Sequence, residues 1–599
     1  MTYCNFLLKR TILTLLLICM SLSARANPME GPEDMTFYSP PIIAIGTPGE
    51  LVWYRDANID IGNGAPDFDA WNVLYHSTNS KGDPNKVTGT VIIPESAWKG
   101  GGERPVISYA VGTHGLDQRC APSIQMTYGT DYENVNIRAA LNKGYAVLVT
   151  DNPGYTNGDV PTYLVGGSQA RAALDIVKAA TEIPGVDIDA GSKVAVWGYS
   201  QGGQTAAWVG GIHNEYAPNV NLVAIAAGGT PADFIDTAHY LNGSIGASFI
   251  LSAVVGIAEQ YPTMLPLYDL LNGEGEEVVG ITKNQCVFES LFEFMNQDTQ
   301  YFTIDNMDLS TVLEEVSSVK DALQLQDIVS DISVPLYQYH GQADEFIPLD
   351  QHYKLKKRYC EKFDDVTFAL YPSEHIVTQF QAAPHVLSWL GDRFSGKTME
   401  GSCNVANVDP VSTANPGGGN FVVSLDEWVL DASIKLKKLR QTVTLPNDST
   451  FSADTDMTSK ALSGDMNIPE FFTKLWIGLP LDVKLAVIPA EAVSGEASLD
   501  GEGILHLHGK AYADIKVKSA GISFFQIPFG CRTRSPAEFS LDLDGPVSML
   551  GSGDLKFEGT TEFEPMRHCG LFNGLFTALM SGTGQKYTFN VLPPNPIVY

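Results

Sequence analysis

The chain has 599 residues, of which 44% are hydrophobic and 18% are charged. This length exceeds what one hydrophobic core usually organises, so we expect at least two domains, and the composition excludes a chain dominated by disorder. The formal net charge of −31 predicts repulsion from nucleic acid and from anionic membranes, but not from neutral lipid or uncharged esters.

Residues 1–26 have the pattern of a signal peptide. Two basic residues precede the short apolar run TILTLLLICMSL, and an Ala-Arg-Ala cleavage pattern ends at Ala26. The run is shorter than the roughly 18–20 residues of a membrane-spanning helix. A lipoprotein signal is the rival interpretation, but Cys19 follows a bulky isoleucine where that signal has a small residue. We therefore expect export, to the outside of the cell or to the periplasm, and no integral membrane span.

Six cysteines remain after the expected cleavage, and an even number in an exported chain favours disulfides over metal sites. No two of them form a Cys-x-x-Cys pair, so no metal centre is expected, and about 15 pairings are open from spacing alone. His506 and His508 share a strand face, but no cluster of acids or cysteines adjoins them, so a solvated face is favoured. The six are Cys120, Cys286, Cys360, Cys403, Cys531 and Cys569.

Residues 27–407 are expected to form an α/β catalytic domain. Continuous apolar runs such as GYAVLVTD, KVAVWGYS, VPLYQYHG and VTFALYP alternate with helical patterns such as SQARAALDIVKAATEI. Strands that are apolar on both faces predict a mostly parallel sheet covered by helices on both sides. VTFALYP is interpreted as the last strand of this sheet.

The other parts of the chain are recognised where this alternation of strands and helices stops. Residues 229–329 lack clear strands and are predicted to form a helical cap insertion, whose apolar residues mostly pack within the cap while a minority line a pocket. Residues 408–420 are a linker rich in Pro and Gly. Residues 421–599 alternate with period two, as in GILHLHGKAYADIKV, and predict a β-rich antiparallel sandwich or barrel.

Ser200 is the candidate nucleophile. It lies in Gly198-Tyr199-Ser200-Gln201-Gly202, between an apolar strand and a helical stretch. Gly-x-Ser-x-Gly in this context places the serine on a tight turn, and the glycines leave room where strand and helix approach closely. A serine hydroxyl also needs a base and donors for the oxyanion.

The partners are expected in the order serine, acid, histidine. Asp344 follows the strand VPLYQYHG, at the edge where parallel sheets carry their active sites. Its neighbour Glu345 is the rival and is interpreted as a solvated loop residue. His375, in a loop after VTFALYP, is the candidate general base. His340, His352 and His385 compete with it, but all three have ordinary structural interpretations.

The oxyanion donors are expected in two places. One is the backbone N–H of Gln201, directly after the nucleophile. The other should come from the loop Gly112–Gly115, where Thr113 or His114 is the candidate. A His114 that only forms local hydrogen bonds is the alternative.

These motifs together resemble the secretory lipase family of α/β-hydrolases, the group that includes fungal lipase A. The resemblance covers about Pro40 to Ser402 and is carried by SYAVGTHGLDQRCAPS, GYAVLVTDNPGY, ARAALDIVKAA, VAVWGYSQGGQTAAW, HGQADEFIPLD and the final SEH. It implies an α/β-hydrolase fold with a helical cap and cleavage of carboxylic esters, including triacylglycerols, by a triad of Ser200, Asp344 and His375.

The resemblance also implies the disulfides Cys120–Cys286 and Cys360–Cys403, and Cys531 and Cys569 are expected to pair within the β-rich part. The basic family pattern does not include the β-rich part after Ser402, whose tail HCGLFNGLFTALMSGTGQKYTFNVLP resembles the ends of β-rich modules on some secreted bacterial proteins. Its role stays open between binding of lipid, polymer or the cell envelope and a stabilising or secretion role.

The sequence thus predicts a secreted serine hydrolase that cleaves lipid esters through an acyl-enzyme, without cofactor, metal or nucleic acid. Two alternatives remain. One is a short-chain or polyester esterase, an acyltransferase or a peptidase on the same fold. The other is a lipid- or envelope-binding protein on a hydrolase scaffold, although such proteins usually lack a triad member.

Overall fold

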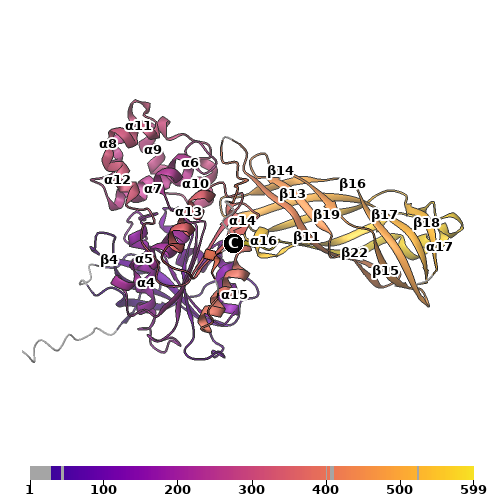
Figure 1. Ribbon diagram of the computed structural model, residues 1–599, viewed down its shortest axis with the longest axis horizontal. Helices are drawn as coiled ribbons and strands as arrows, with labels where there is room; N and C mark the ends of the chain where they lie inside the picture. Colours follow the sequence, from indigo (N-terminus) through magenta and orange to yellow (C-terminus); the bar gives the residue numbers. More distant parts are fainter. Residues whose placement is uncertain (1–27, 42–45, 400, 405–409, 418, 523–524) are drawn as a thin grey trace, which may run out of the picture.

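The computed structural model describes the chain except for residues 1–27, 42–45, 400, 405–409, 418 and 523–524. The expected signal peptide and part of the expected linker therefore lie outside the described residues. Two sheets dominate the rest, and they lie at opposite ends of an elongated molecule (Figure 1).

The hydrolase sheet has 11 strands, and its central strands β6, β5, β7, β8, β9 and β10 are parallel. On one side β4 pairs antiparallel with β6, so the sheet is mixed. In spatial order the strands are β1 (Met29–Glu30), β2 (Leu51–Asp56), β3 (Phe68–Thr78), β4 (Pro84–Pro94), β6 (Ala146–Thr150), β5 (Val106–Ala110), β7 (Val194–Tyr199), β8 (Leu222–Gly228), β9 (Leu336–Gly341), β10 (Val366–Tyr371) and β23 (Ile597–Val598).

Helices cover both faces of this sheet because the central strands are apolar on both sides. In β7, Val194 and Val196 pack on one face and Ala195 and Trp197 on the other. The first face carries α4 (Gly166–Ala180), α5 (Gln201–Tyr216) and α13 (Leu349–Cys360). The second carries α2 (Pro122–Tyr128), α3 (Asn134–Asn142) and α15 (Ala383–Phe394).

Residues 229–329 form only helices and turns apart from isolated bridges. They stand as a group above the carboxyl ends of the parallel strands (Figure 1). The α-helices are α6 (Phe234–Leu241), α7 (Ala247–Gln260), α8 (Leu267–Leu270), α9 (Gly273–Thr282), α10 (Val287–Glu293), α11 (Leu309–Glu315) and α12 (Ser317–Gln324).

The second sheet is antiparallel and encloses an apolar core. Its period-two pattern is clear in β17, where Leu505 and Leu507 are buried and His506 and His508 face outward. Its strands are β11 (Val422–Leu436), β12 (Gln441–Thr444), β13 (Thr450–Asp456), β14 (Ala461–Asn467), β15 (Phe471–Trp476), β16 (Pro480–Leu499), β17 (Ile504–Ile522), β18 (Phe525–Thr533), β19 (Ala537–Pro546), β20 (Leu555–Phe563), β21 (Met566–Arg567) and β22 (Gly582–Leu592).

The two parts are joined more closely than the linker pattern predicts. β23 returns to the hydrolase sheet and pairs antiparallel with β10, so the expectation that VTFALYP (β10) is its last strand is wrong. The Tyr599 N–H donates to the Phe368 carbonyl at 2.8 Å, and the two rings pack together. A two-residue strand 226 positions beyond its partner leaves no periodic signal in the sequence.

A short helix makes the second connection. Helix α16 (Met549–Ser552) packs on α14 (His375–Gln381), and Val377 and Phe380 of α14 belong to the same core as Leu550. The core of the β-rich part is therefore continuous with residues of the hydrolase part. Within the described residues, none of the helices combines the length and apolar character needed to cross a membrane.

Candidate active site

Ser200 occupies the turn between β7 and α5. Its backbone has φ 58° and ψ −120°, a conformation that side-chain-bearing residues rarely adopt. The Ser200 N–H donates to the Gly228 carbonyl at 2.9 Å, which fixes the turn to β8. Strain of this kind projects a serine side chain away from both flanking elements.

The glycines around Ser200 are required by close backbone approaches. A Cβ at Gly198 would lie 2.2 Å from the Gly202 carbonyl oxygen, and one at Gly202 would lie 1.9 Å from the Ala110 carbonyl oxygen. Any larger residue would therefore push α5 away from the sheet, and the nucleophile with it.

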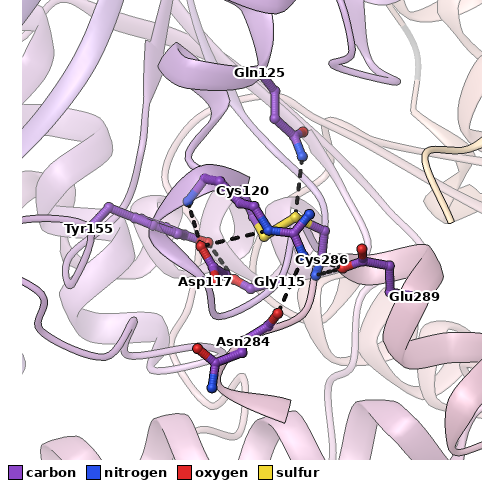
Figure 2. The surroundings of a disulfide bond; sticks show 9 residues. Gly115, Asp117, Cys120, Gln125, Tyr155, Asn284, Cys286 and Glu289 are labelled. Atoms are coloured by element: carbon purple, nitrogen blue, oxygen red, sulfur yellow. Dashed lines mark hydrogen bonds and ion pairs between the residues drawn. A yellow bond between two sulfur atoms is a disulfide. The ribbon is translucent and has the colours of Figure 1, made fainter. Parts of the chain in front are cut away.

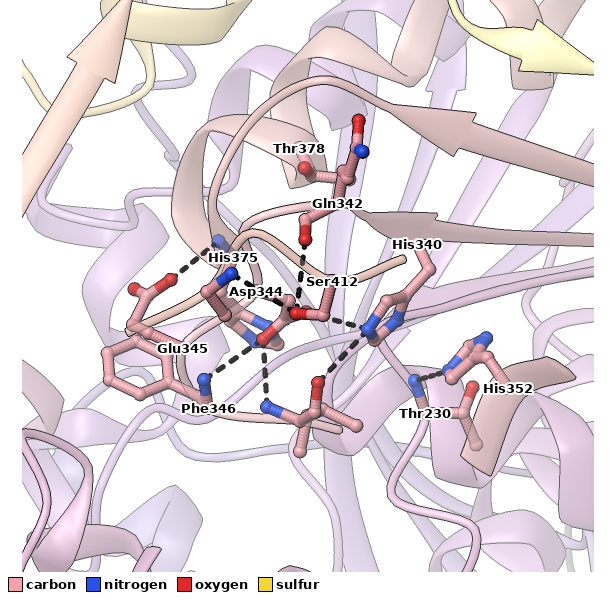
Figure 3. A network of polar contacts seen from close by, with 12 residues as sticks. Thr230, His340, Gln342, Asp344, Glu345, Phe346, His352, His375, Thr378 and Ser412 are labelled. Carbon is pink, nitrogen blue, oxygen red and sulfur yellow. Dashed lines mark hydrogen bonds and ion pairs between the residues drawn. The ribbon is translucent and has the colours of Figure 1, made fainter. Parts of the chain in front are cut away.

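Asp344 and His375 form a direct, buried hydrogen bond. The distance from Asp344 Oδ2 to His375 Nδ1 is 2.7 Å (Figure 3). The other carboxylate oxygen, Oδ1, accepts the N–H groups of Phe346 at 3.0 Å and Ile347 at 2.8 Å. His375 is the first residue of helix α14, so the expectation that it lies in a loop is wrong.

The charge of Asp344 is held by its neighbours. Burial by itself raises the pKa of this carboxyl, but the imidazoles of His375 and His340 and the backbone donors outweigh burial, and the net pKa is lowered. Asp344 is thus an anion that can fix the tautomer of His375 and stabilise an imidazolium.

Glu345 is buried, with 4% of its surface exposed, so its interpretation as a solvated loop residue is wrong. Its Oε2 accepts the backbone N–H of His375 at 3.1 Å. Burial, together with the charge of Asp344, raises the pKa of Glu345 to about 7. Glu374, the N-cap of α14, is also buried, and burial raises its pKa well above the ordinary value. Glu345 and Glu374 thus support the position of His375.

The competing histidines have structural partners. His340 Nε2 contacts the Ile347 carbonyl at 3.0 Å and Asp344 Oδ2 at 3.6 Å. His352 accepts the N–H of Thr230 (Figure 3), and burial lowers its pKa well below the ordinary value. His385 lies in α15 and packs against Tyr371.

Ser200 and His375 are brought close but are not hydrogen-bonded to each other in the part of the chain that the structure describes. The ring of Tyr199, next to Ser200, packs on the His375 imidazole with 4.8 Å between centroids. A Cβ at Gly229 would touch both rings. Catalytic hydrogen bonds are often long in enzymes without substrate and tighten only when it binds.

The loop after β5 is held by three consecutive residues that the sequence analysis missed. The Gly112 N–H donates to Glu133 at 2.6 Å, and the Tyr132 hydroxyl donates to the Thr113 carbonyl at 2.9 Å. His114 Nε2 lies 3.2 Å from Asp131. Asp131–Glu133 therefore form a clamp on this loop. Their signal in the sequence is only two acids flanking a tyrosine before α3.

The candidate oxyanion donors differ in what surrounds them. Gln201 begins α5, where backbone N–H groups and the helix dipole favour negative charge. The imidazole of His114 is occupied by Asp131 and by the Gly112 carbonyl. The Thr113 hydroxyl contacts the Tyr163 hydroxyl at 2.8 Å, and Tyr163 lines the cavity at Ser200. This arrangement favours Thr113 over His114 in the loop.

An apolar cavity of about 130 Å³ adjoins Ser200 and Gln201. Most of its wall comes from the cap, including Phe234, Phe249 and Val254, and these lining residues are a minority of the cap's apolar residues, as the sequence analysis expects. Phe346, which packs on His375 with 5.3 Å between ring centroids, also lines it. The cavity can therefore hold an apolar group next to the serine.

The structure contains the disulfides Cys120–Cys286, Cys360–Cys403 and Cys531–Cys569. The first joins Cys120, five residues after the loop Gly112–Gly115, to Cys286, the N-cap of cap helix α10 (Figure 2). Beside it, the Val287 N–H donates to the His114 carbonyl at 2.9 Å.

In the described part of the chain, no three His, Cys, Asp or Glu residues form a group that could hold a metal ion. His506 contacts Asp544 at 2.8 Å on the outer face of the β-rich part, and His508 contacts Asp542 at 3.3 Å.

Comparison with known proteins agrees with this architecture. Candida antarctica lipase A superposes with a TM-score of 0.55 and 24% identity, over 65% of this chain and 90% of that one. A rice cell wall degrading esterase, LipA from Xanthomonas oryzae, superposes with a TM-score of 0.51 and 18% identity, over 58% of this chain and 100% of that one. The first part of the chain thus has the α/β-hydrolase fold.

Sequence comparisons find secretory lipases. The model described as "Secretory lipase" matches residues 120–401. A secreted triacylglycerol lipase of Malassezia furfur is 24% identical over 425 residues, which are 68% of this chain and 85% of the relative. Lipase 10 of Candida albicans is 28% identical over 423 residues, or 66% and 88%. Residues 120–401 thus match the secretory lipases, and these relatives support a fungal lipase A-like α/β-hydrolase that is a carboxylic ester hydrolase.

Proposed function

We propose that this protein is a secreted lipase that hydrolyses triacylglycerols and related long-chain esters with Ser200, Asp344 and His375. Three features support the proposal: the strained turn at Ser200, the buried Asp344–His375 hydrogen bond of 2.7 Å, and the family relationship. The observation that carries the choice of substrate is the apolar cavity, which places the cap's hydrophobic side chains directly beside Ser200.

The proposed reaction has two steps. Ser200 attacks the ester carbonyl while His375 Nε2 takes its proton, and Asp344 stabilises the imidazolium. The N–H of Gln201 and a donor from the Thr113 region stabilise the oxyanion. His375 then protonates the leaving alcohol, and a water molecule, activated by the same imidazole, releases the fatty acid and restores Ser200.

The test is Ser200→Ala, assayed with a chain-length series of chromogenic esters and with emulsified triacylglycerol. We expect the variant to fold like the wild type and to lose more than about 10⁴-fold in kcat, because the nucleophile is gone. Ser317→Ala, at an exposed position in the cap, is the control and should keep full activity.

The same series separates the substrate classes. A lipase with an apolar cavity at its nucleophile should prefer long acyl chains. A preference for acetyl or butyryl esters would indicate an esterase, and full activity of Ser200→Ala would remove the nucleophile assignment.

We also propose that the mature protein begins after residue 26 and is exported. The basic residues, apolar run and Ala-Arg-Ala pattern support this cleavage, as does the description of the Malassezia relative as secreted. The N-terminal sequence of protein recovered from culture medium tests it.

A further inference from the structure

The end of the β-rich part that lies away from the hydrolase sheet exposes large apolar side chains. Phe472 and Trp476 of β15 are 62% and 60% exposed, and Leu479 in the following turn is 55% exposed. Ile522 of β17 and Phe525 of β18 are 43% and 62% exposed, and Leu571, before α17 (Asn573–Met580), is fully exposed. We call these six side chains the distal tip.

The distal tip is one surface, because the elements that carry it are neighbours. Trp476 pairs with Pro480 across the β15–β16 turn, and Asp482 of β16 pairs with Gly521 of β17. The ring of Phe529 in β18 packs on Phe572, next to Leu571. Figure 1 shows β15, β18 and α17 together at the end farthest from the hydrolase sheet. Exposed aromatic and aliphatic residues gathered in this way mark an interaction site.

The charge around the distal tip is opposite to that of the chain. Segments 435–440, 516–534 and 567–586 contain ten Lys and Arg residues and no Asp or Glu, in a protein whose net charge is −31. Two side-chain bonds between Gln441 and the backbone of Trp476, at 2.7 and 2.8 Å, hold the first segment beside the tip. Lys438 reaches the Thr577 carbonyl of α17.

Acids beside these segments neutralise part of this charge. Glu470 forms ion pairs with Lys484 and Lys518 at 2.7 and 2.9 Å, and Asp514 lies 3.8 Å from Arg532, while Glu562 and Glu564 precede the third segment. Asp482 lies in β16 and is half-buried. The tip still presents apolar side chains within a basic surround.

We propose that the distal tip binds the surface of an anionic lipid bilayer, with its apolar side chains inserted among the lipids and its basic residues at the headgroups. Each Lys or Arg near such a surface contributes about 1 kcal/mol, and apolar insertion adds to this. A second copy of the chain complements the tip less well, because two tips repel each other. Because the tip lies at the end farthest from the hydrolase sheet, the β-rich part would hold the acidic hydrolase part at a distance from the bilayer.

The experiment measures binding without hydrolysis. Full-length Ser200→Ala protein is sedimented with vesicles of phosphatidylcholine, with or without phosphatidylglycerol. We expect tight binding only when phosphatidylglycerol is present. Adding Trp476→Ala and Phe525→Ala should weaken it by at least about 10-fold, and adding Lys437→Gln and Lys438→Gln by about 30-fold. Tyr128→Ala, at a residue that is 72% exposed on the hydrolase part, should change nothing.

The tip substitutions are also made with Ser200 intact, where unchanged hydrolysis of a soluble ester shows that the fold is preserved. Because binding is measured on the inactive serine variant, failure of the proposed function would not affect this result. Equal binding to both vesicle types, no effect of the tip substitutions, or a concentration-dependent dimer that Trp476→Ala abolishes would each overturn the proposal.

Discussion

The carboxylate of Asp344 is fixed in direction because both oxygens have defined partners. Two backbone N–H groups point at Oδ1, so in Asp344→Asn the amide oxygen must stay there and the NH₂ group must face His375 Nδ1. The imidazole then carries its proton on Nε2 and cannot accept one from Ser200. We expect kcat for a soluble ester to fall about 10⁴-fold with KM little changed.

The matched control for this prediction is Asp350→Asn. Asp350 is a nearby acid that lies exposed in the first turn of α13 and pairs only with Lys354 among the ion pairs described. It should retain wild-type kcat. An Asp344→Asn enzyme with near-normal kcat would show that the orientation of His375 has another source.

The ion pair of His114 and Asp131 predicts a pH dependence of stability. Burial lowers the pKa of His114, but Asp131 and Glu133 outweigh it and raise the pKa to about 9, against an ordinary value of about 6.5. Protonated His114 therefore stabilises the fold below about pH 6.5, and this contribution is lost as pH rises through about 9. The difference in Tm between wild type and His114→Gln should be large at low pH and shrink above pH 9. A difference independent of pH would contradict the ion pair.

For single residues, the sequence predicted which side chains form the candidate site but not which side chains surround them. Ser200, Asp344 and His375 follow recognisable strands, and order along the chain suggests their roles. Asp344 and Glu345 are adjacent acids, however, and nothing local shows that both are buried. Asp131–Glu133 act on a loop about 20 positions earlier, a contact that only the packing of α3 creates.

Among the elements, α14 links the proposed catalytic base His375 to the β-rich part, because it begins with this residue and packs on α16. A Cβ at Gly551 would lie 2.4 Å from the Val377 carbonyl oxygen and 2.9 Å from the Gln381 nitrogen. In Gly551→Ala, α16 and α14 must separate. We expect a several-fold lower kcat and a loss of about 1–3 kcal/mol in the free energy of unfolding.

Gly280→Ala is the control for this substitution. Gly280 is a helical glycine in α9 with open space around its Cβ position, so alanine should be neutral or stabilise slightly. If Gly551→Ala leaves both kcat and stability unchanged, contact with α16 does not position His375.

Strands that are buried on both faces are predictable because they form continuous apolar runs, and β5 to β10 all do. Helix α14 was not predicted, because it begins three residues after β10 and its seven residues are too few for a sustained helical period. β23 has two residues, and only its pairing with β10 defines it.

For the whole molecule, a prediction concerns the disulfide that attaches the cap to the hydrolase sheet, compared with a second disulfide outside the cap. Cys120–Cys286 spans 166 positions and Cys360–Cys403 spans 43. Replacing the first pair by serines should cost about 1 kcal/mol more in unfolding free energy than replacing the second, because the longer loop gains more entropy. Denaturant unfolding of both double variants measures this difference.

The two variants should also differ in activity. Of these two disulfides, only Cys120–Cys286 lies beside the loop Gly112–Gly115, for which we propose an oxyanion donor, so its removal should lower kcat/KM for soluble esters beyond any loss of folded protein. The Cys360–Cys403 variant should keep its kcat/KM under conditions where it is folded. If both variants lose kcat/KM to the same extent, the Cys120–Cys286 disulfide does not position the loop Gly112–Gly115.

Length and composition predicted two domains, and the change of period near residue 421 predicted where the β-rich part begins. Neither could predict that the core of that part continues into α14, since a shared core depends on how the parts dock. The net charge of −31 likewise describes an average, and it concealed the basic end of the β-rich part.

The pairing of β23 with β10 has a consequence for biogenesis. During synthesis, residues 366–371 leave the ribosome long before residues 597–598 exist, so the nascent hydrolase sheet emerges with an unprotected edge and an unsupported α14. Under the proposed export, translocation of the unfolded chain and folding of the whole chain afterwards avoid this interval. Premature termination anywhere in the β-rich part would yield a species prone to edge-to-edge aggregation rather than a smaller working lipase.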